Sequence, residues 1–137
     1  MRWIDVLYTC LMEGSKVKNK ETGDLGEKMA CLFLERKGYT ILETKVRAMW
    51  CEIDIIACLD SIIHFVEVKS VSRASDAEWY RPEELVHARK LDKIARFADF
   101  YINQKNDDRD YQIDVIGVFL NKRTHTAQCR ITENVTL

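Results

Sequence analysis

The sequence has one proline and five glycines among its 137 residues, which excludes a long flexible linker and a collagen-like fibre. It has no excess of either charge, because 21 lysines and arginines stand against 22 aspartates and glutamates, so net charge indicates no partner. Hydrophobic residues at 47% and charged residues at 31% exclude a disordered tail and a membrane-spanning bundle. A chain of this length is expected to form one domain with a single core.

Cysteine pairs with metal-binding or redox spacing are also missing. The five cysteines are scattered: Cys10, Cys31, Cys51, Cys58 and Cys129. An odd, unpatterned set predicts free thiols in a reducing compartment, so we expect a cytoplasmic protein. The three histidines have no ligand spacing either, and no structural zinc site is expected.

The first 22 residues are interpreted as an amphipathic segment followed by a polar loop. Asp5 interrupts the apolar stretch, and no small-residue cleavage site follows, which argues against a signal peptide. Residues 13–23 are polar and rich in lysine, as in a connecting loop. Residues 23–137 are expected to form the functional domain.

Beyond this segment, hydrophobic patterning predicts two helices and five strands. A helix over residues 24–37 is expected to end at Gly38, because glycine favours the left-handed backbone found after a helix. A second helix is expected from Pro82 to about Gln104. The expected strands are residues 39–47, 52–59, 62–71, 111–120 and 124–131. The order α-β-β-β-α-β-β predicts a mixed sheet with helices packed on it, an α/β sandwich.

Charged residues interrupt two strands that are otherwise largely apolar. The strand 52–59 carries Asp54, and the strand 62–71 carries Glu67 and Lys69. A tight turn at Asp60-Ser61 lies midway between the two acids, so their carboxylates can lie at similar height on neighbouring strands. Burying an unpaired carboxylate costs several kcal/mol of folding free energy, so both acids need partners or a metal ion. Strict alternation places residues 51, 53, 55, 57 and 59 on one face and Asp54 on the other.

Asp54, Glu67 and the main-chain carbonyl of Val68 would make an all-oxygen site suited to Mg²⁺ or Mn²⁺. Lys69 beside it could orient a water molecule or stabilise the negative charge that develops in phosphoryl chemistry. The alternative is a buried ion pair of Lys69 with Asp54 or Glu67 that only fixes the register of the strands.

Glu27 is a third candidate acid. It begins the stripe Glu27, Ala30, Cys31, Leu34, which is otherwise apolar and core-facing. Its carboxylate could therefore reach the edge of the same site. Alternatively, Asp24 and Glu27 form a capping box, in which Glu27 only satisfies the start of the helix. The sequence leaves both interpretations open.

Three runs, taken together, resemble the YraN-like family of bacterial proteins. They are GDLGEKMACLFLERKGYTIL (residues 23–42), KVRAMWCEIDIIA (residues 45–57) and HFVEVKS (residues 64–70). That family looks like a member of the PD-(D/E)XK nuclease superfamily and is similar in arrangement to archaeal Holliday-junction resolvases. The resemblance implies a restriction endonuclease-like α/β sandwich, with a mixed central sheet flanked by helices.

The resemblance also implies a function: metal-dependent hydrolysis of phosphodiester bonds in DNA, with branched or damaged DNA as candidate substrates. The implied catalytic residues are Glu27, Asp54, Glu67 and Lys69. Asp54, Glu67 and the Val68 carbonyl would bind Mg²⁺ or Mn²⁺, Lys69 would align the attacking water, and Glu27 would support a second metal or the water.

Lys90, Arg73 and Arg47 are the candidate contacts to DNA phosphates. Because resolvase-like relatives act as dimers, a homodimer is a candidate assembly, and no membrane partner is expected. The basic residues around Lys90 form only a modest electrostatic footprint, and Cys51 stands where the family has glycine. These two features motivate an alternative function, a nucleic-acid-binding module of the same fold with little or no catalysis.

Overall fold

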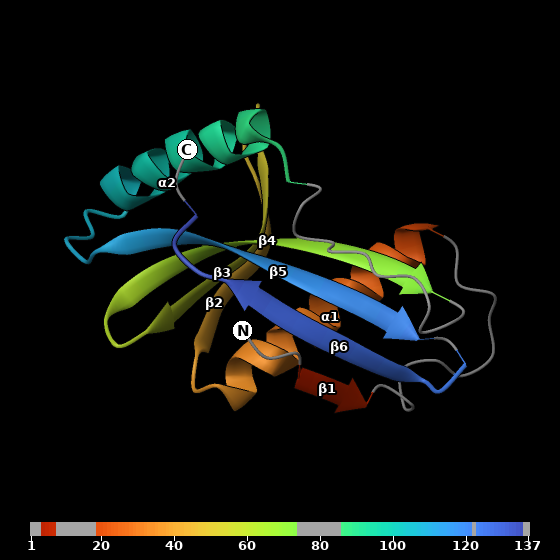
Figure 1. Ribbon diagram of the computed structural model, residues 1–137. Coiled ribbons are helices and arrows are strands. Elements are labelled where there is room, and N and C mark those ends of the chain that lie inside the picture. Colours follow the sequence, from red (N-terminus) through yellow and green to blue (C-terminus); the bar gives the residue numbers. More distant parts are fainter. Residues whose placement is uncertain (1–3, 8–18, 74–85, 122, 136–137) are drawn as a thin grey trace.

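The computed structural model describes residues 4–7, 19–73, 86–121 and 123–135 (Figure 1). These residues form β1 (Ile4–Leu7), α1 (Asn19–Arg36), β2 (Thr40–Arg47), β3 (Glu52–Leu59), β4 (Ile62–Arg73), α2 (Ala88–Gln104), β5 (Tyr111–Asn121) and β6 (Thr126–Thr132). From α1 onward the order is α-β-β-β-α-β-β, which confirms the expected succession of elements.

One mixed sheet contains all six strands, in the order β1-β6-β5-β4-β3-β2. The central pair β4 and β5 is parallel, and every other neighbouring pair is antiparallel. The helix α2 lies in the connection between the two parallel strands, as a parallel pair requires. The short strand β1, which was not expected from the sequence, pairs with β6 at the edge of the sheet.

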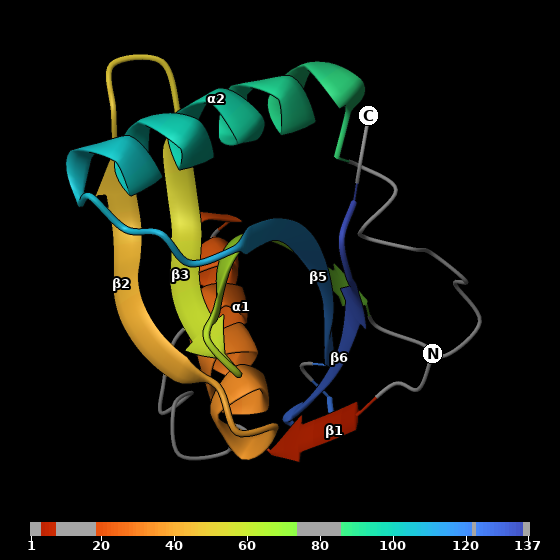
Figure 2. The same ribbon diagram turned by 90° about the vertical axis from the view of Figure 1, so that its left-hand side faces the viewer.

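Two apolar clusters cover opposite faces of the sheet. Side chains of α1, including Met29, Phe33 and Leu34, pack on alternate residues of β3, β4, β5 and β6. Side chains of α2 pack on the other face, with Phe65 among their contacts in the sheet. The buried positions of α2 are Leu91, Ile94, Phe97 and Ala98. Figure 2 shows the resulting layers, with α1 and α2 on either side of the sheet, and the α/β sandwich is confirmed.

The end of α1 follows from its sequence. Gly38 adopts φ 92°, and its N–H donates to the carbonyl of Glu35. The N–H of Tyr39 donates to the carbonyl of Leu34, which completes a Schellman motif. The expected role of Gly38 is confirmed.

The start of α1 differs from the expectation. The helix begins at Asn19, so residues 19–23 are helical and the expected polar loop over 13–23 is wrong for that part; residues 8–18 lie outside the described residues. Asp24 therefore lies in the second turn of the helix and cannot act as its N-cap. The capping-box interpretation of Asp24 and Glu27 is wrong.

The start of α2 also differs. Val86 and His87 are not helical, and His87 has the extended backbone (φ −82°, ψ 155°) that precedes the first helical residue, Ala88. The expected start at Pro82 lies outside the described residues. Among the residues that are described, no helix is long and apolar enough to cross a membrane.

The hairpin between β3 and β4 has the expected tight turn. Asp60 and Ser61 adopt φ 50° and 65°, the two positive values of a type I′ turn. This turn matches the right-handed twist of the strands and sets their register, in which Leu59 faces Ile62 and Ile55 faces Val66.

Candidate functional site

The pairing of β3 with β4 ends just before the acidic residues. Ile55 and Val66 are the last partners in the register, which, continued by one residue, places Asp54 opposite Glu67. Beyond this point the main-chain N–H of Val68 donates to Asp54 Oδ2 at 2.8 Å instead of to a β3 carbonyl. The structure thus brings the two acids together at the point where the strands separate.

The strand β3 does not keep strict alternation here. Ile55 packs in the cluster under α1, whereas Ile53 packs in the cluster under α2 with Cys51. The expected single face for residues 51 to 59 is therefore wrong. The strand twists across Asp54, which leaves this carboxylate where side chains from both faces of the sheet can approach it.

Asp54 is mainly surrounded by protein. Burial raises the pKa of its carboxyl group, and the N–H of Val68 opposes that rise by donating to the charged form. Glu27 approaches from α1, and the positive charge of Lys90 reaches it from α2.

Glu67 is nearly inaccessible, with 5% of its surface exposed. Its carboxylate lies between two lysines, with Lys69 Nζ 3.8 Å from Oε1 and Lys90 Nζ 3.9 Å from Oε2. Neither distance is short enough for a direct hydrogen bond. Burial and the charge of Asp54 raise the pKa of Glu67 to about 7, although both lysines act against the rise. The ion pair of Lys69 with Glu67 exists, but within the described ranges Glu67 Oε2 has no hydrogen-bond donor.

Glu27 reaches the site because α1 packs unusually close to β4. A Cβ atom on Gly26 would lie 1.6 Å from Ser70 Oγ and 2.7 Å from Ser70 Cβ, so only glycine permits this approach. The next residue, Glu27, then faces Asp54. Burial and the charge of Asp54 raise the pKa of Glu27 to about 7, while Lys45 lowers it.

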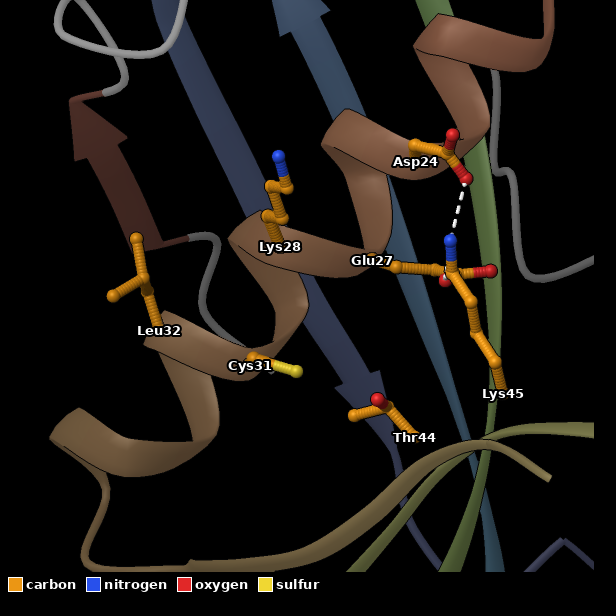
Figure 3. A pocket seen from close by; sticks show the side chains of 7 residues that line it. All are labelled: Asp24, Glu27, Lys28, Cys31, Leu32, Thr44 and Lys45. Atoms are coloured by element: carbon orange, nitrogen blue, oxygen red, sulfur yellow. Dashed lines mark hydrogen bonds and ion pairs between the residues drawn. The ribbon is translucent and has the colours of Figure 1, made fainter.

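Lys45 was not identified from the sequence. It lies on β2 with φ 51°, a left-handed conformation that costs a non-glycine residue about 1 kcal/mol or more. Its Nζ lies 2.9 Å from Asp24 Oδ1 and 3.9 Å from Glu27 Oε2. These residues line a pocket of about 380 Å³ between α1 and β2, shown in Figure 3. Glu27 lines the pocket and also neighbours Asp54, so the pocket adjoins the acidic site.

The site has spare capacity for a ligand. Among the described residues, Glu27 Oε2 and Glu67 Oε2 are buried and accept no hydrogen bond. Buried polar atoms without partners are uncommon and often mark positions for an ion or water. Within the same residues, no three His, Cys, Asp or Glu side chains are already arranged to hold a metal ion. Asp54 and Glu67 still supply the carboxylate oxygens that Mg²⁺ prefers, and Mg²⁺ usually keeps several waters besides one or two carboxylates.

The three candidate phosphate contacts have different surroundings. Lys90 belongs to the site itself, because its Nζ also lies 3.4 Å from the carbonyl oxygen of Glu52. Arg47 is largely exposed at the end of β2, with Nε 3.2 Å from Glu52 Oε2. Arg73 ends β4, and its side chain lies outside what the structure describes.

The model of one protein family matches residues 26–118, a range that includes Gly26, Glu27, Asp54, Glu67 and Lys90. The chain belongs to the uncharacterised protein family UPF0102. The resemblance to YraN-like proteins is thereby confirmed, and the match begins at the glycine that lets α1 approach β4.

Relatives in this family match over nearly their full length. A UPF0102 protein of Clostridium acetobutylicum is 43% identical over 117 residues, which covers 85% of this chain and 93% of the relative. A UPF0102 protein of Aliarcobacter butzleri is 41% identical over 120 residues, which covers 87% of this chain and 99% of the relative. A third, from Natranaerobius thermophilus, is 37% identical over 119 residues and is covered to 95% of its length.

Proposed function

We propose that this protein is a metal-dependent endonuclease that hydrolyses phosphodiester bonds in DNA. The observation that carries the proposal is the convergence of Glu27, Asp54 and Glu67 from three elements, with Lys69 and Lys90 beside them. Two oxygens of these carboxylates lack hydrogen-bond donors among the described residues. A core that buries mutually repelling acids loses stability, so the arrangement needs a compensating role.

Each residue has a distinct part in the proposed reaction. Asp54 and Glu67, with the Val68 carbonyl, would hold Mg²⁺ or Mn²⁺, which supplies electrostatic stabilisation of the phosphoryl charge and an acidic bound water. Lys69 orients the attacking water and Lys90 interacts with the phosphate oxygens. Hydrolysis forms one bond from the water oxygen to phosphorus, breaks one phosphorus–oxygen ester bond, and transfers a proton to the departing alkoxide.

Glu27 is placed to receive the proton from the water. Its Oε2 is buried and accepts no hydrogen bond from the described residues, so this oxygen is available to accept a proton. Lys45 lies on the pocket side of Glu27, and its positive charge acts at a distance of 3.9 Å between Nζ and Oε2.

The proposal is tested with plasmid, single-stranded and branched DNA incubated with the purified protein in Mg²⁺, Mn²⁺ or EDTA. Cleavage is expected only with a divalent cation, and Asp54→Asn and Lys69→Met should each reduce its rate at least about 100-fold. The matched control is Asp60→Asn, which removes a carboxylate from the exposed turn at the other end of β3 and keeps a residue suited to positive φ. Cleavage that survives Asp54→Asn would belong to a contaminant.

A second candidate is a nucleic-acid-binding module that performs little or no catalysis. The observation in its favour is that no three ligating side chains in the described ranges form a ready metal site. Binding titrations in EDTA separate the two proposals. Metal-independent affinity, combined with no cleavage of any of the three substrates, would favour the binding module.

A reducing, cytoplasmic location is part of the proposal. The described cysteines, Cys31, Cys51, Cys58 and Cys129, all carry free thiols. Free thiols persist in a reducing compartment, which is also where a DNA-directed enzyme of a bacterium meets its substrate.

A further inference from the structure

The turn between β2 and β3 carries apolar side chains into solvent. Met49 is fully exposed and Trp50 is 44% exposed at the two central positions of the turn. Turns of this kind usually carry glycine, asparagine, aspartate or serine, as the Asp60-Ser61 turn at the other end of β3 does. The complete exposure of Met49 at such a tip is therefore a feature that folding does not explain.

The base of this turn is firmly held. The N–H of Ala48 donates to the carbonyl of Cys51 at 2.8 Å, and the N–H of Cys51 donates back at 3.4 Å. Ala48 and Cys51 also pack in the cluster under α2. The ring of Trp50 meets Phe100 of α2 edge-to-face, with centroids 5.9 Å apart. The turn that carries Met49 is thus held in place by main-chain hydrogen bonds and by packing against α2.

The tip lies close to the acidic site. Met49 and Asp54 are five positions apart in the sequence, so their Cα atoms are at most about 18 Å apart. With about 3.4 Å per nucleotide along a strand, this corresponds to about five nucleotides. Two basic side chains contact Glu52, which lies between the tip and Asp54 in the sequence: Arg47 at its carboxylate and Lys90 at its carbonyl oxygen. Arg47 remains largely exposed and can still meet a phosphate.

We propose that Met49 and Trp50 bind DNA where base stacking is interrupted, at a nick, gap or branch point, with Met49 inserted between bases and Trp50 stacked on an exposed base. Methionine is among the apolar residues that proteins insert between base steps. Opening an intact step costs about a few kcal/mol, whereas at an interruption the bases are already free to separate. The turn therefore selects interrupted DNA over intact duplex. This inference rests on the proposed function and names its substrate class.

The binding test uses fluorescence anisotropy in EDTA, with an intact duplex, a nicked duplex and a three-way junction of matched sequence. The wild type should prefer the interrupted DNAs, and Met49→Ala/Trp50→Ala should lose about tenfold of that preference with little change on intact duplex. The control Leu42→Ala removes another exposed apolar side chain from the same hairpin, away from the tip, and should keep the preference.

The cleavage test uses the same DNAs with Mg²⁺ or Mn²⁺, and the cuts should cluster within about five nucleotides of the interruption. Equal affinity of the wild type for intact and interrupted DNA, or a preference that survives the double substitution, would overturn the inference. A change of oligomeric state in the double variant, measured as the mass of the assembly in solution, would also overturn the inference. It would mean that Met49 and Trp50 form contacts between protein molecules. Binding that depends on Met49 and Trp50 but occurs without any cleavage would support the role of the turn and refute the nuclease. Cleavage without a preference for interrupted DNA would support the nuclease and refute the role of the turn.

Discussion

Two buried polar clusters border the same strand, β4, and they are built in opposite ways. Around His64, Asp114 accepts hydrogen bonds from His64 Nδ1 at 2.5 Å, Gln112 Nε2 at 2.8 Å and the main-chain N–H of Asn134 at 2.9 Å. About 10 Å further along β4, Glu67 has one buried oxygen that accepts none from the described residues. The first cluster is satisfied by the protein itself. Within the described part of the chain the second is left incomplete, as expected of a site that takes an external ligand.

The largest expected difference is in stability. Asp114→Ala leaves the buried His64 and two less buried donors, Gln112 and the Asn134 N–H, without their acceptor and should lower the free energy of unfolding by about 3–5 kcal/mol. Asp54→Ala should lower it by less, about 1 kcal/mol, because the lost acceptor of the Val68 N–H is offset by the removed repulsion from Glu27 and Glu67. Urea denaturation in EDTA measures both. Equal losses in the two variants would mean that the acidic cluster contributes as much to folding stability as the cluster around His64.

The next effect is the dependence of stability on pH. The pKa values of Glu27 and Glu67 rise from 4.5 to about 7 on folding, so between these values the folded state binds more protons than the unfolded one. The stability that these two groups contribute is then greatest below about pH 4.5 and falls as the pH rises to 7. The fall is about 3 kcal/mol for either group alone, and less than twice that for the two together because both interact with Asp54.

Urea denaturation of the metal-free protein at a series of pH values checks this slope. Glu27→Gln combined with Glu67→Gln should remove most of it, since neither group then titrates. A double variant with the same slope as the wild type would show that other groups are responsible and that the two clusters do not differ in this respect.

A third effect comes from the contact that brings α1 onto β4. Gly26→Ala should destabilise the protein by about 2 kcal/mol, because its Cβ atom would overlap Ser70. Ser70→Gly should restore part of the loss. The matched control is Gly23→Ala in the same helix, where no atom lies within 4 Å and the better helix former should stabilise by about 0.5–1 kcal/mol. Equal effects of the two alanines would contradict the close packing.

The sequence predicted the parts of the site that depend on local geometry. The type I′ turn at Asp60-Ser61 fixes the β3–β4 register, and the equal offsets of Asp54 and Glu67 from that turn place them opposite each other. Alternation failed near Asp54, because the strand twists where its pairing with β4 ends. A turn sets the strand pairing over a few residues. Beyond them, the packing of the helices determines which face of the sheet each side chain lies on.

The contacts that the sequence did not predict join distant segments. His64 and Asp114 are fifty residues apart and meet across the parallel β4–β5 pair, whose register is set by a helical crossover instead of a turn. The position of the Lys45 side chain depends on the left-handed backbone of this residue, which a lysine in the sequence does not predict. Gly26 did carry a signal, since a glycine inside a helical pattern often marks close packing.

The smallest expected effect is stabilisation by a divalent cation, and it distinguishes the clusters most directly. A cation that binds only the folded protein at ten times its dissociation constant adds about 1.4 kcal/mol to the free energy of unfolding. Mg²⁺ or Mn²⁺ should do so in the wild type and in Asp60→Asn, but not in Asp54→Asn, when NaCl keeps the ionic strength equal. The pH slope should also flatten with the cation present, because a bound cation favours the charged carboxylates. Stabilisation that persists in Asp54→Asn would place the cation elsewhere and leave the unsatisfied oxygens of Glu27 and Glu67 without this explanation.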